Sequence, residues 1–384
     1  MDKAIGVLKK NTMVIALIVV LVFFTVATGG KMLLPQNVNN LISQNAYVFI
    51  LATGMLLCIL TGGNIDLSVG CIVCISGAIG GSLMVQKDAS PALAIPVMLL
   101  MGIVIGIWQG FWIAYVRIPP FIVTLAGMLI WRGLSNVILQ GLTLAPLPDS
   151  YLALFNNYVP DFLGGSTINY TCILVGIIAC IIYIMSQLRS RVSKAKKGYE
   201  TEKISSMILK IVVICVVILW FTYKLSQYKG IPFMLLWIAA IVFIYTYITK
   251  KTVIGRHIYA VGGNEKATKL SGINTNHIYF IVYLNMAFLA AVAGLVTAAR
   301  LNSANPTAGT NYEMDAIGAC FIGGASAYGG IGSTGGVVVG ALLMGVINQG
   351  MIIMGVDANW QKVVKGGVLL LAVIFDVLSK KNDK

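Results

Sequence analysis

A glycine-rich stretch, GGASAYGGIGSTGG at residues 323–336, has the spacing of a nucleotide-binding loop. Within it, residues 330–335 match G-x-G-x-x-G, whose backbone amides can bind a pyrophosphate. That function needs a strand before the loop, a helix after it and an acidic residue about 20 positions further on. Here residues 320–329 have a helical pattern, and no suitable acid follows. The chain also lacks G-x-x-x-x-G-K-[ST], so we predict that it does not itself bind ATP and that its glycines serve close helix packing.

A second stretch, GGNIDLSVG at residues 62–70, places polar side chains at a turn between two long apolar runs. Asn64, Asp66 and Ser68 supply an amide, a carboxylate and a hydroxyl. A carboxylate inside a membrane is costly unless it meets a partner, water or a helix amino terminus. Two interpretations remain open. Either Asp66 satisfies the first-turn amides of the next helix with Asn64 as its cap, or these groups belong to a gate or polar path.

The remaining reactive side chains do not form an enzyme site. Cys71 and Cys74 have the C-x-x-C spacing, but the seven cysteines lie in apolar runs, where they serve as small buried side chains. His257 and His277 are the two histidines, and only 13 acidic residues accompany them, without a visible acid–base pair or metal-ligand cluster. We therefore predict no catalytic residue, no metal site, no disulfide and no cofactor.

The composition is that of a chain embedded in a membrane. Hydrophobic residues make up 58% of the 384 residues, charged residues 10%, and the mean hydropathy is +0.89, whereas soluble domains are about half apolar and a quarter charged. Because a helix needs about 20 apolar residues to cross a hydrocarbon core about 30 Å thick, we predict an all-α polytopic membrane protein. The predicted spans are residues 12–29, 43–62, 66–86, 91–115, 121–139, 168–187, 206–223, 231–249, 278–299, 313–329, 335–355 and 361–378.

Lysine and arginine residues set the predicted orientation. With both termini in the cytoplasm, most of them fall on the cytoplasmic side, as the positive-inside rule requires. The net charge of +14 then needs no nucleic-acid partner. The first apolar run, between Lys10 and Gly29, also suits a signal peptide, but an even number of spans with both termini on one side favours a retained helix. The basic residues placed inside include Lys3, Lys9, Lys10, Arg189, Arg191, Lys194, Lys196, Lys197, Lys250, Lys251, Arg256, Lys266, Lys269, Lys380, Lys381 and Lys384.

A loop on that side, residues 252–274, contains a short helix signal. Asn264 is a suitable N-cap, Glu265 suits the first turn and Gly272 suits the stop, so we predict a helix over residues 265–271. A helix this short is not stable in water alone. It therefore packs either on its own protein or into a partner, and its apolar residues, Ala267 and Leu270, fit both.

Four motifs in one order carry a resemblance to a known family. GGNIDLSVG, IPPFIVTLAGMLIWRGL (118–134), GRHIYAVGGNEKATKLSGI (255–273) and DAIGACFIGGASAYGGIGSTGG (315–336) together resemble the membrane permease of bacterial ABC importers for monosaccharides. The closest resemblance is to the branch that handles several sugars, such as xylose, galactose, arabinose and glucose. It covers nearly the whole chain, taken as one domain, residues 1–384, with the ABC importer permease fold. Ribose-type relatives have fewer spans, so residues 168–223 are expected to be a helical hairpin inserted into a core of ten spans.

The resemblance also implies partners and a mechanism. Such permeases reside in the bacterial cell membrane and form homodimers with the translocation path between the two copies. An extracytoplasmic sugar-binding protein delivers the sugar, and a cytoplasmic ABC ATPase subunit supplies the ATP hydrolysis that this chain lacks. Residues 252–274 then form the loop that couples the ATPase to the spans through Gly263, Asn264, Glu265, Ala267, Leu270, Ser271 and Gly272. The expected path or gate residues are Asn64, Asp66, Ser68, Ser76, Thr124 and Ser326.

A proton-coupled secondary sugar carrier is the alternative function. Such a carrier needs protonatable groups in its core and usually a basic G-x-x-x-D-[RK]-x-G-[RK]-[RK] loop between spans two and three. GGNIDLSVG has no basic residue, and Asp66 is the one acid in spans two to five. Further polar side chains could line a path or pair one helix with another; they are Gln109, Asn136, Gln140, Asn285, Asn348 and Gln349.

Overall fold

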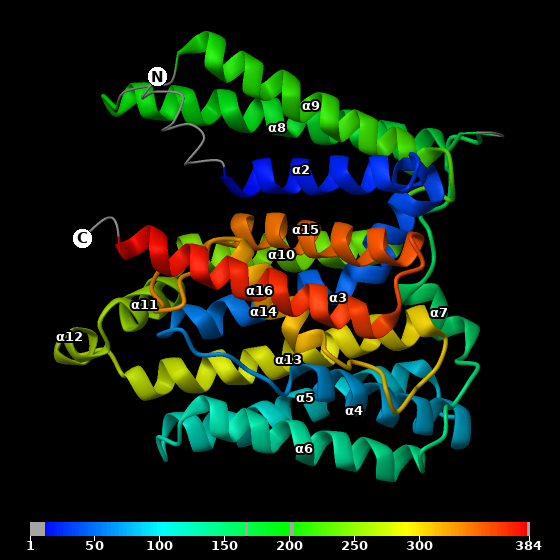
Figure 1. The fold of residues 1–384 in the computed structure, drawn as a ribbon, viewed down its shortest axis with the longest axis vertical. Coiled ribbons are helices and arrows are strands. Elements are labelled where there is room, and N and C mark those ends of the chain that lie inside the picture. The colour runs from blue at the N-terminus through cyan, green and yellow to red at the C-terminus, as the bar shows by residue number, and fades with distance from the viewer. Residues whose placement is uncertain (1–11, 166–167, 200–202, 382–384) are drawn as a thin grey trace.

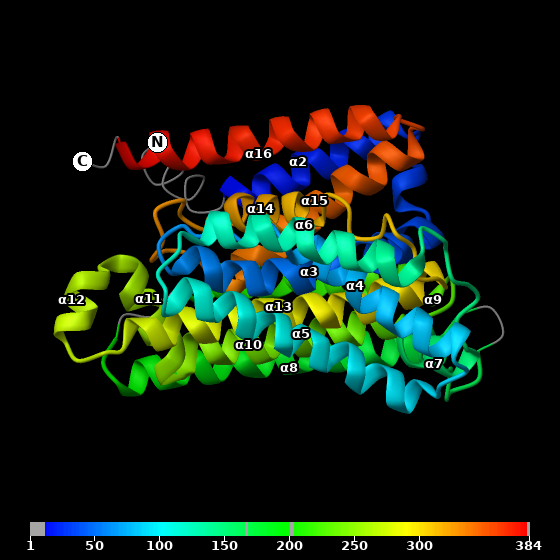
Figure 2. The same cartoon turned by 90° about the horizontal axis from the view of Figure 1, so that it is seen from below.

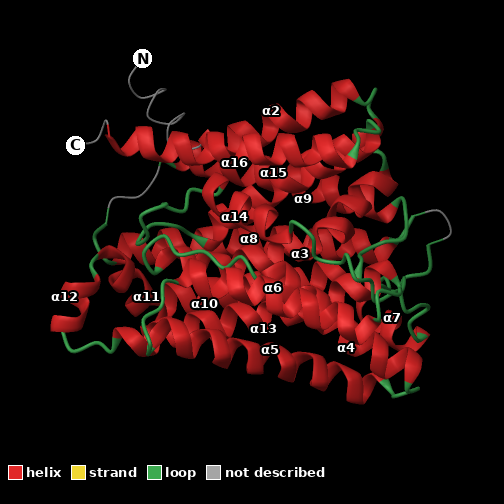
Figure 3. Ribbon diagram, turned by 60° about the horizontal axis from the view of Figure 1, so that its bottom comes forward, coloured by secondary structure: helices red, strands yellow, loops and turns green. Residues whose placement is uncertain are grey.

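Long helices that run side by side dominate the structure. The computed structural model describes residues 12–165, 168–199 and 203–381, and in those residues it contains α-helices and two isolated β-bridges but no sheet (Figure 1). Loops gather at the two ends of the bundle (Figure 3). The prediction of an all-α polytopic fold is confirmed. The residues expected on the cytoplasmic side near the termini, Lys3, Lys9, Lys10 and Lys384, lie outside the described ranges.

Nine helices of the described chain are long and apolar enough to cross a membrane. They are α3 (Pro35–Leu60), α4 (Val69–Gly81, continued by a π-helical turn Ser82–Gln86), α5 (Pro91–Ala114), α6 (Pro120–Leu139), α8 (Tyr170–Lys196), α9 (Ile204–Ser226), α10 (Phe233–Lys251), α13 (Thr275–Leu301) and α15 (Thr334–Ile353). Three further apolar helices run with them: α2 (Thr12–Ala27), α14 (Tyr312–Ile322) and α16 (Ala358–Lys381). Each of the twelve predicted spans overlaps one of these helices.

One predicted span is too long. Residues 313–329 were expected to be continuous, but α14 ends at Ile322 after 11 residues. Gly324 has a φ of +80°, which ends the helix, and a side chain at Gly323 would place its Cβ 2.5 Å from the carbonyl oxygen of Gly336. Small apolar residues continue beyond Ile322, which is why composition alone predicted a longer helix.

The centre of the bundle is α3 and α13, which pack against each other. Nearly every residue of α3 from Ala46 to Leu60 is buried. α13 also packs closely on α5, where a Cβ at Gly102 would lie 2.5 Å from Cβ of Ala291. Missing side chains let helices approach closely in a membrane, where dispersion contacts replace the hydrophobic effect. These contacts hold the helices on which the site residues lie.

The helices α8 and α9 pack on each other at one edge of the bundle, at the top in Figure 1. Most apolar side chains of α9 are exposed, as expected for a helix that faces lipid. This is where the sequence placed a hairpin at residues 168–223. That the hairpin is an insertion stays a prediction.

The connections divide between the two ends of the bundle. α11 (Val253–Gly263) and α12 (Glu265–Leu270) project at the end where α2 begins and α16 ends, on the left in Figures 1 and 2. α7 (Asp149–Phe155) lies at the opposite end. The start of the first described helix and the end of the last therefore lie at the end that carries the loop 252–274. Which side of the membrane this end faces stays a prediction.

Candidate functional site

The glycine-rich segment 323–333 forms a backbone junction. The amide of Gly330 donates to the carbonyl oxygen of Leu60 at 3.0 Å. A Cβ at Gly262 would lie 1.7 Å from that same oxygen, and a Cβ at Gly63 would lie 1.9 Å from the carbonyl oxygen of Ala327. The segment thus joins the end of α3 to the end of α11 through contacts that leave no room for a side chain. The predicted packing role of these glycines is confirmed.

The turn between α3 and α4 holds Asp66 in a fully buried position. Its Oδ1 accepts hydrogen bonds from the backbone amide of Ser68 at 2.8 Å and from the Ser68 hydroxyl at 2.6 Å. The interpretation of Asp66 as a first-turn acid of α4 is wrong, because α4 begins at Val69 with Ser68 as its N-cap position. Asn64 does not cap α4 either, since its Nδ2 donates to the carbonyl oxygen of Thr61 at 3.1 Å.

Side chains from α5 and α6 complete a buried polar cluster, which we define as Asp66, Ser68, Gln109 and Trp131. Gln109 on α5 donates from Nε2 to the Ser68 hydroxyl at 2.5 Å. Trp131 on α6 joins it across Gly127, where a Cβ would lie 3.0 Å from Gln109 Nε2 and 3.1 Å from Trp131 Nε1. The cluster thus connects the α3–α4 turn with two neighbouring helices.

Three atoms of this cluster have no hydrogen-bond partner within the described part of the chain: Asp66 Oδ2, Gln109 Oε1 and Trp131 Nε1. All three atoms are buried, and the Tyr283 hydroxyl on α13 is another buried atom without a partner in the described residues. A buried polar group without a partner costs about 1–3 kcal/mol. Such groups call for a water or a ligand.

The other predicted path residues are buried in the single chain. Ser76 on α4 donates to the carbonyl oxygen of Ala291 on α13 at 3.4 Å. Thr124 lies one turn before Gly127 on α6, close to the cluster, whereas Ser326 lies in the segment after α14. The structure thus brings together Asp66, Ser68 and Gln109, with Thr124 nearby. It places Ser76 and Ser326 apart from them. Their role in a path stays a prediction.

Two further charged side chains inside the bundle, Arg132 and Asp315, are paired with acceptors or with an opposite charge. Arg132 on α6 donates to the carbonyl oxygens of Pro306 and Ala308 at 2.9 and 2.8 Å. Asp315 on α14 forms an ion pair with Lys365 on α16 at 3.0 Å, and the hydroxyl of Tyr47 donates to it. Pairing of this kind is what makes a charge tolerable in a membrane. The Asp315–Lys365 pair, which sequence reasoning missed, ties α16 to the bundle.

The short helix predicted over residues 265–271 exists as α12, and its predicted cap is confirmed, while its coupling role stays a prediction. Asn264 Oδ1 accepts from the amide of Ala267 at 3.0 Å. Gly272 has a φ of +83° and ends the segment, although the helix stops at Leu270, one residue before the predicted end. Leu270 is 89% exposed, and Ala267 and Ser271 are also exposed. α12 projects beyond the bundle in Figure 1, and its exposed side chains include two small ones and one leucine.

Glu265, the first residue of α12, is anchored to two other segments. Its Oε1 lies 2.7 Å from Arg117 in the α5–α6 turn, and its Oε2 lies 3.1 Å from the hydroxyl of Tyr279 on α13. Partial burial opposes ionisation of Glu265, but the hydrogen bond and charge of Arg117 outweigh it and hold the pKa of that carboxyl below its usual value. The Tyr279 hydroxyl also lies 3.1 Å from the carbonyl oxygen of Thr61 in the α3–α4 turn. We call Arg117, Glu265 and Tyr279 the hub.

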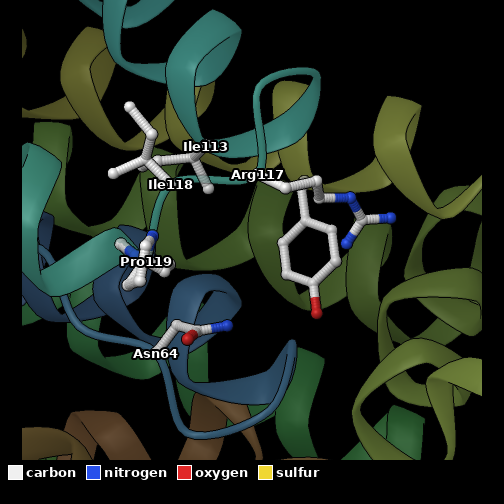
Figure 4. A pocket seen from close by; sticks show the side chains of 7 residues that line it. Asn64, Ile113, Arg117, Ile118 and Pro119 are labelled. Atoms are coloured by element: carbon white, nitrogen blue, oxygen red, sulfur yellow. The ribbon is translucent and has the colours of Figure 1, made fainter.

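A small pocket lies beside the hub. Its volume is about 120 Å³, and Asn64, Arg117 and Pro119 border it (Figure 4). The other lining residues are Ile113, Ile118, Pro120 and Tyr279. Ile113 lies one helical turn from Gln109 and Asn64 lies two residues from Asp66, so the pocket is next to the buried polar cluster along both segments.

Known proteins resemble the chain over nearly its whole length. The xylose transport system permease protein XylH of Haemophilus influenzae is 39% identical over 98% of this chain and 98% of its own length. The XylH protein of Escherichia coli K12 is 35% identical over 98% of this chain and 93% of its own length. The ribose import permease protein RbsC of E. coli K12 is 35% identical over 89% of this chain and 85% of its own length. No solved structure matches the chain.

The family comparison agrees with these relatives. Residues 37–373 match the family described as branched-chain amino acid transport system / permease component. The matched range begins in α3 and ends in α16, so it includes the buried polar cluster, the glycine junction and α12. The helices of the described residues are those of a multi-pass membrane protein. The chain therefore belongs to this family of transport-system permease components.

Proposed function

We propose that this chain is the membrane permease subunit of an ATP-driven ABC importer for monosaccharides of the xylose, galactose, arabinose or glucose type. The observation that carries the proposal is the likeness to permeases of xylose and ribose systems along nearly the full chain. The geometry supports it, because α12 presents an exposed docking face and the bundle holds a polar cluster with unpaired atoms. The polar groups of the cluster suit the hydroxyls of a sugar.

The proposal includes an assembly in a bacterial cell membrane. Two copies of the chain form a homodimer, an extracytoplasmic binding protein delivers the sugar, and an ABC ATPase subunit hydrolyses ATP. Both termini face the cytoplasm, together with the loop 252–274. The ATPase receives α12 in a cleft, with Ala267, Leu270 and Ser271 in contact. ATP binding then favours one arrangement of the spans over the other, which is the differential affinity that any such shift requires.

The path proposal follows from the side chains that the bundle leaves unsatisfied. Asp66, Ser68 and Thr124 lie on the segments that enclose the cluster, and Gln109 joins them. Separation of α6 from α5 would expose these groups to the interior of the dimer. Asn64, Ser76 and Ser326 are proposed to line the same route at other depths. Residues 168–223 are proposed to be an inserted hairpin at the lipid-facing edge.

Reconstitution tests this function. The chain, the ATPase subunit and the binding protein of its system are placed in liposomes, and uptake of labelled xylose, galactose, arabinose and glucose is measured with and without ATP. We expect uptake of at least one sugar that requires both ATP and the binding protein and that survives a protonophore. Uptake without the ATPase subunit that a protonophore abolishes would instead support the proton-coupled carrier.

A further inference from the structure

The hub brings together three motifs that lie far apart in the sequence. Glu265 belongs to GRHIYAVGGNEKATKLSGI, Arg117 immediately precedes IPPFIVTLAGMLIWRGL, and the Thr61 carbonyl immediately precedes GGNIDLSVG. The carboxylate of Glu265 bonds to Arg117 at 2.7 Å, and the hydroxyl of Tyr279 lies 3.1 Å from both Glu265 and Thr61. One side chain of α12 is thus linked to the α5–α6 turn directly and to the α3–α4 turn through a single tyrosine.

Arg117 is held in this position from several sides. Its guanidinium also donates to the Thr275 hydroxyl at 3.0 Å and to Asn276, and it lies 5.3 Å from the centre of the Tyr279 ring. Its backbone has a φ of +64°, a left-handed conformation that is unfavourable for a residue with a side chain. Such a conformation persists only where the surroundings fix it. The contacts of the guanidinium supply that restraint.

The two turns joined by the hub lead directly into the helices that bear the cluster. The α3–α4 turn carries Asp66 and Ser68, and the α5–α6 turn leads into α6 with Gly127 and Trp131. Pro119 and Pro120 fix the backbone between Arg117 and α6, so a shift of Arg117 passes to α6 with little bending. The pocket of about 120 Å³ beside these prolines leaves the turn room to move.

We propose that Arg117 is a positioning residue: through Glu265 and Tyr279 it makes a displacement of α12 move the α3–α4 and α5–α6 turns together, and so opens the buried polar cluster. This inference rests on the proposed docking of α12 into an ATPase. It adds the intramolecular route by which that docking reaches the cluster. Arg117 itself contacts neither sugar nor ATPase in this account. Its loss should therefore separate ATP hydrolysis from transport rather than stop hydrolysis.

The test is a double-mutant cycle in the reconstituted importer. Arg117→Gln, Glu265→Gln and the double variant are compared for sugar molecules imported per ATP hydrolysed. We expect each single variant to lower that ratio at least about fivefold. In Arg117→Gln, ATP hydrolysis without sugar should continue at the wild-type rate. Because both residues act through one contact, the double variant should be no worse than the more severe single variant. Arg117→Lys keeps the positive charge but not the planar guanidinium group. It should restore part of the ratio of sugar imported to ATP hydrolysed.

Control variants distinguish the loss of the hub contacts from non-specific effects of a substitution at this end of the bundle. Arg256→Gln removes an exposed positive charge from α11, at the same end of the bundle but outside the hub, and should leave the ratio unchanged. Spin labels at Lys266→Cys and Val116→Cys, both exposed positions, report the distance between α12 and the α5–α6 turn. With Arg117 present this distance should stay constant between the ATP-free and ATP-bound states. In Arg117→Gln it should change between them.

The outcomes are distinct. A wild-type importer without ATP-dependent uptake would overturn the proposed function. A normal importer whose ratio stays at the wild-type value in Arg117→Gln and Glu265→Gln would overturn the hub alone. Additive losses in the double variant, or a label distance that is equally constant without Arg117, would also overturn it.

Discussion

The buried polar cluster and the hub are two polar regions built in opposite ways. In the cluster, Asp66 Oδ2, Gln109 Oε1 and Trp131 Nε1 are buried without a partner in the described residues. In the hub, both carboxylate oxygens of Glu265 are bonded, and Arg117 has several acceptors. The cluster lies inside the bundle, whereas the hub lies at its end, next to the exposed α12.

This difference indicates different roles for the two regions. The cluster is suited to bind water or a ligand, and the hub is suited to transmit a displacement between segments. Unpaired buried groups gain when water or a hydroxyl-bearing molecule reaches them, which is the property we propose for a site on the path. Bonded groups lose when their geometry changes, so the hub keeps its parts together. A transporter needs both properties, and here they lie on adjacent segments.

The largest expected effect comes from the glycine junction that supports the hub end of the bundle. Gly262→Ala places a methyl group 1.7 Å from the carbonyl oxygen of Leu60, so backbone must shift. Overpacking of this kind costs about 1–3 kcal/mol or more, and we expect a clear fall in the thermal unfolding midpoint of the purified protein. Gly263→Ala is the matched control for stability, because nothing lies within 4 Å of its Cβ. Equal midpoints for the two variants would show that the junction is not tightly packed.

The second prediction separates function from stability in the cluster. Gln109→Leu removes a buried amide whose Oε1 is unpaired, so the loss of its bond to Ser68 should cost only about 1 kcal/mol. Sugar uptake should nevertheless fall at least about tenfold, because the path loses a polar group where the transition requires one. Ser135→Ala, which removes a buried polar group from the neighbouring helix α6, is the control for general repacking. Uptake that stays at the wild-type level would make the cluster purely structural.

A third prediction concerns pH at the hub. The pKa of Glu265 is lowered in the folded state, so its pair with Arg117 stabilises the protein above the unfolded pKa of about 4.3. This contribution is lost as the pH falls through the lower, folded value. The difference in unfolding midpoint between wild type and Glu265→Gln should therefore be constant from pH 8 to about pH 5.5 and shrink in more acidic buffer. A difference that grows on acidification would contradict the pair.

The smallest effect is expected at a charged surface outside the hub. The last turns of α8 and the residue that follows them carry basic side chains, and anionic lipid should bind there, with each residue worth about 1 kcal/mol of attraction. Neutralising them to Gln should reduce the amount of anionic lipid that copurifies, with little change in uptake. Lys224→Gln at the other end of the hairpin serves as the control. A large loss of sugar uptake would show that this segment has a role in coupling. The substituted residues are Arg189, Arg191, Lys194, Lys196 and Lys197.

The helices and the cap of α12 could be predicted because their signals are local. Long apolar runs set the spans, and Asn264 and Gly272 mark the ends of α12 within a few residues. One of the two interpretations of Asp66 put it in the first turn of α4, because the sequence does not show that the helix begins only at Val69. The length of α14 was overestimated for a related reason, since a positive φ at Gly324 cannot be read from composition.

The hub and the cluster could not be predicted as units, because their members are distant in the chain. Arg117 and Glu265 are separated by 148 positions, and only the packing of α5, α12 and α13 brings them together. Trp131 was visible within IPPFIVTLAGMLIWRGL, but its proximity to Gln109 depends on the missing side chain at Gly127. The Asp315–Lys365 pair likewise joins α14 to α16 across 50 positions. No local pattern in the sequence marks such contacts.

The most direct test of the account is the response of sugar uptake to Ala267→Trp in the reconstituted importer. Ala267 is exposed on α12 next to Leu270, so a bulky ring there should leave the fold intact and overpack the contact with the ATPase at a cost of about 1–3 kcal/mol. We predict that uptake and transport-stimulated ATP hydrolysis fall together, while sugar binding by the separate binding protein is unchanged. Wild-type uptake at normal expression would contradict the account and move the coupling role to another loop, first of all the basic connection at residues 188–205.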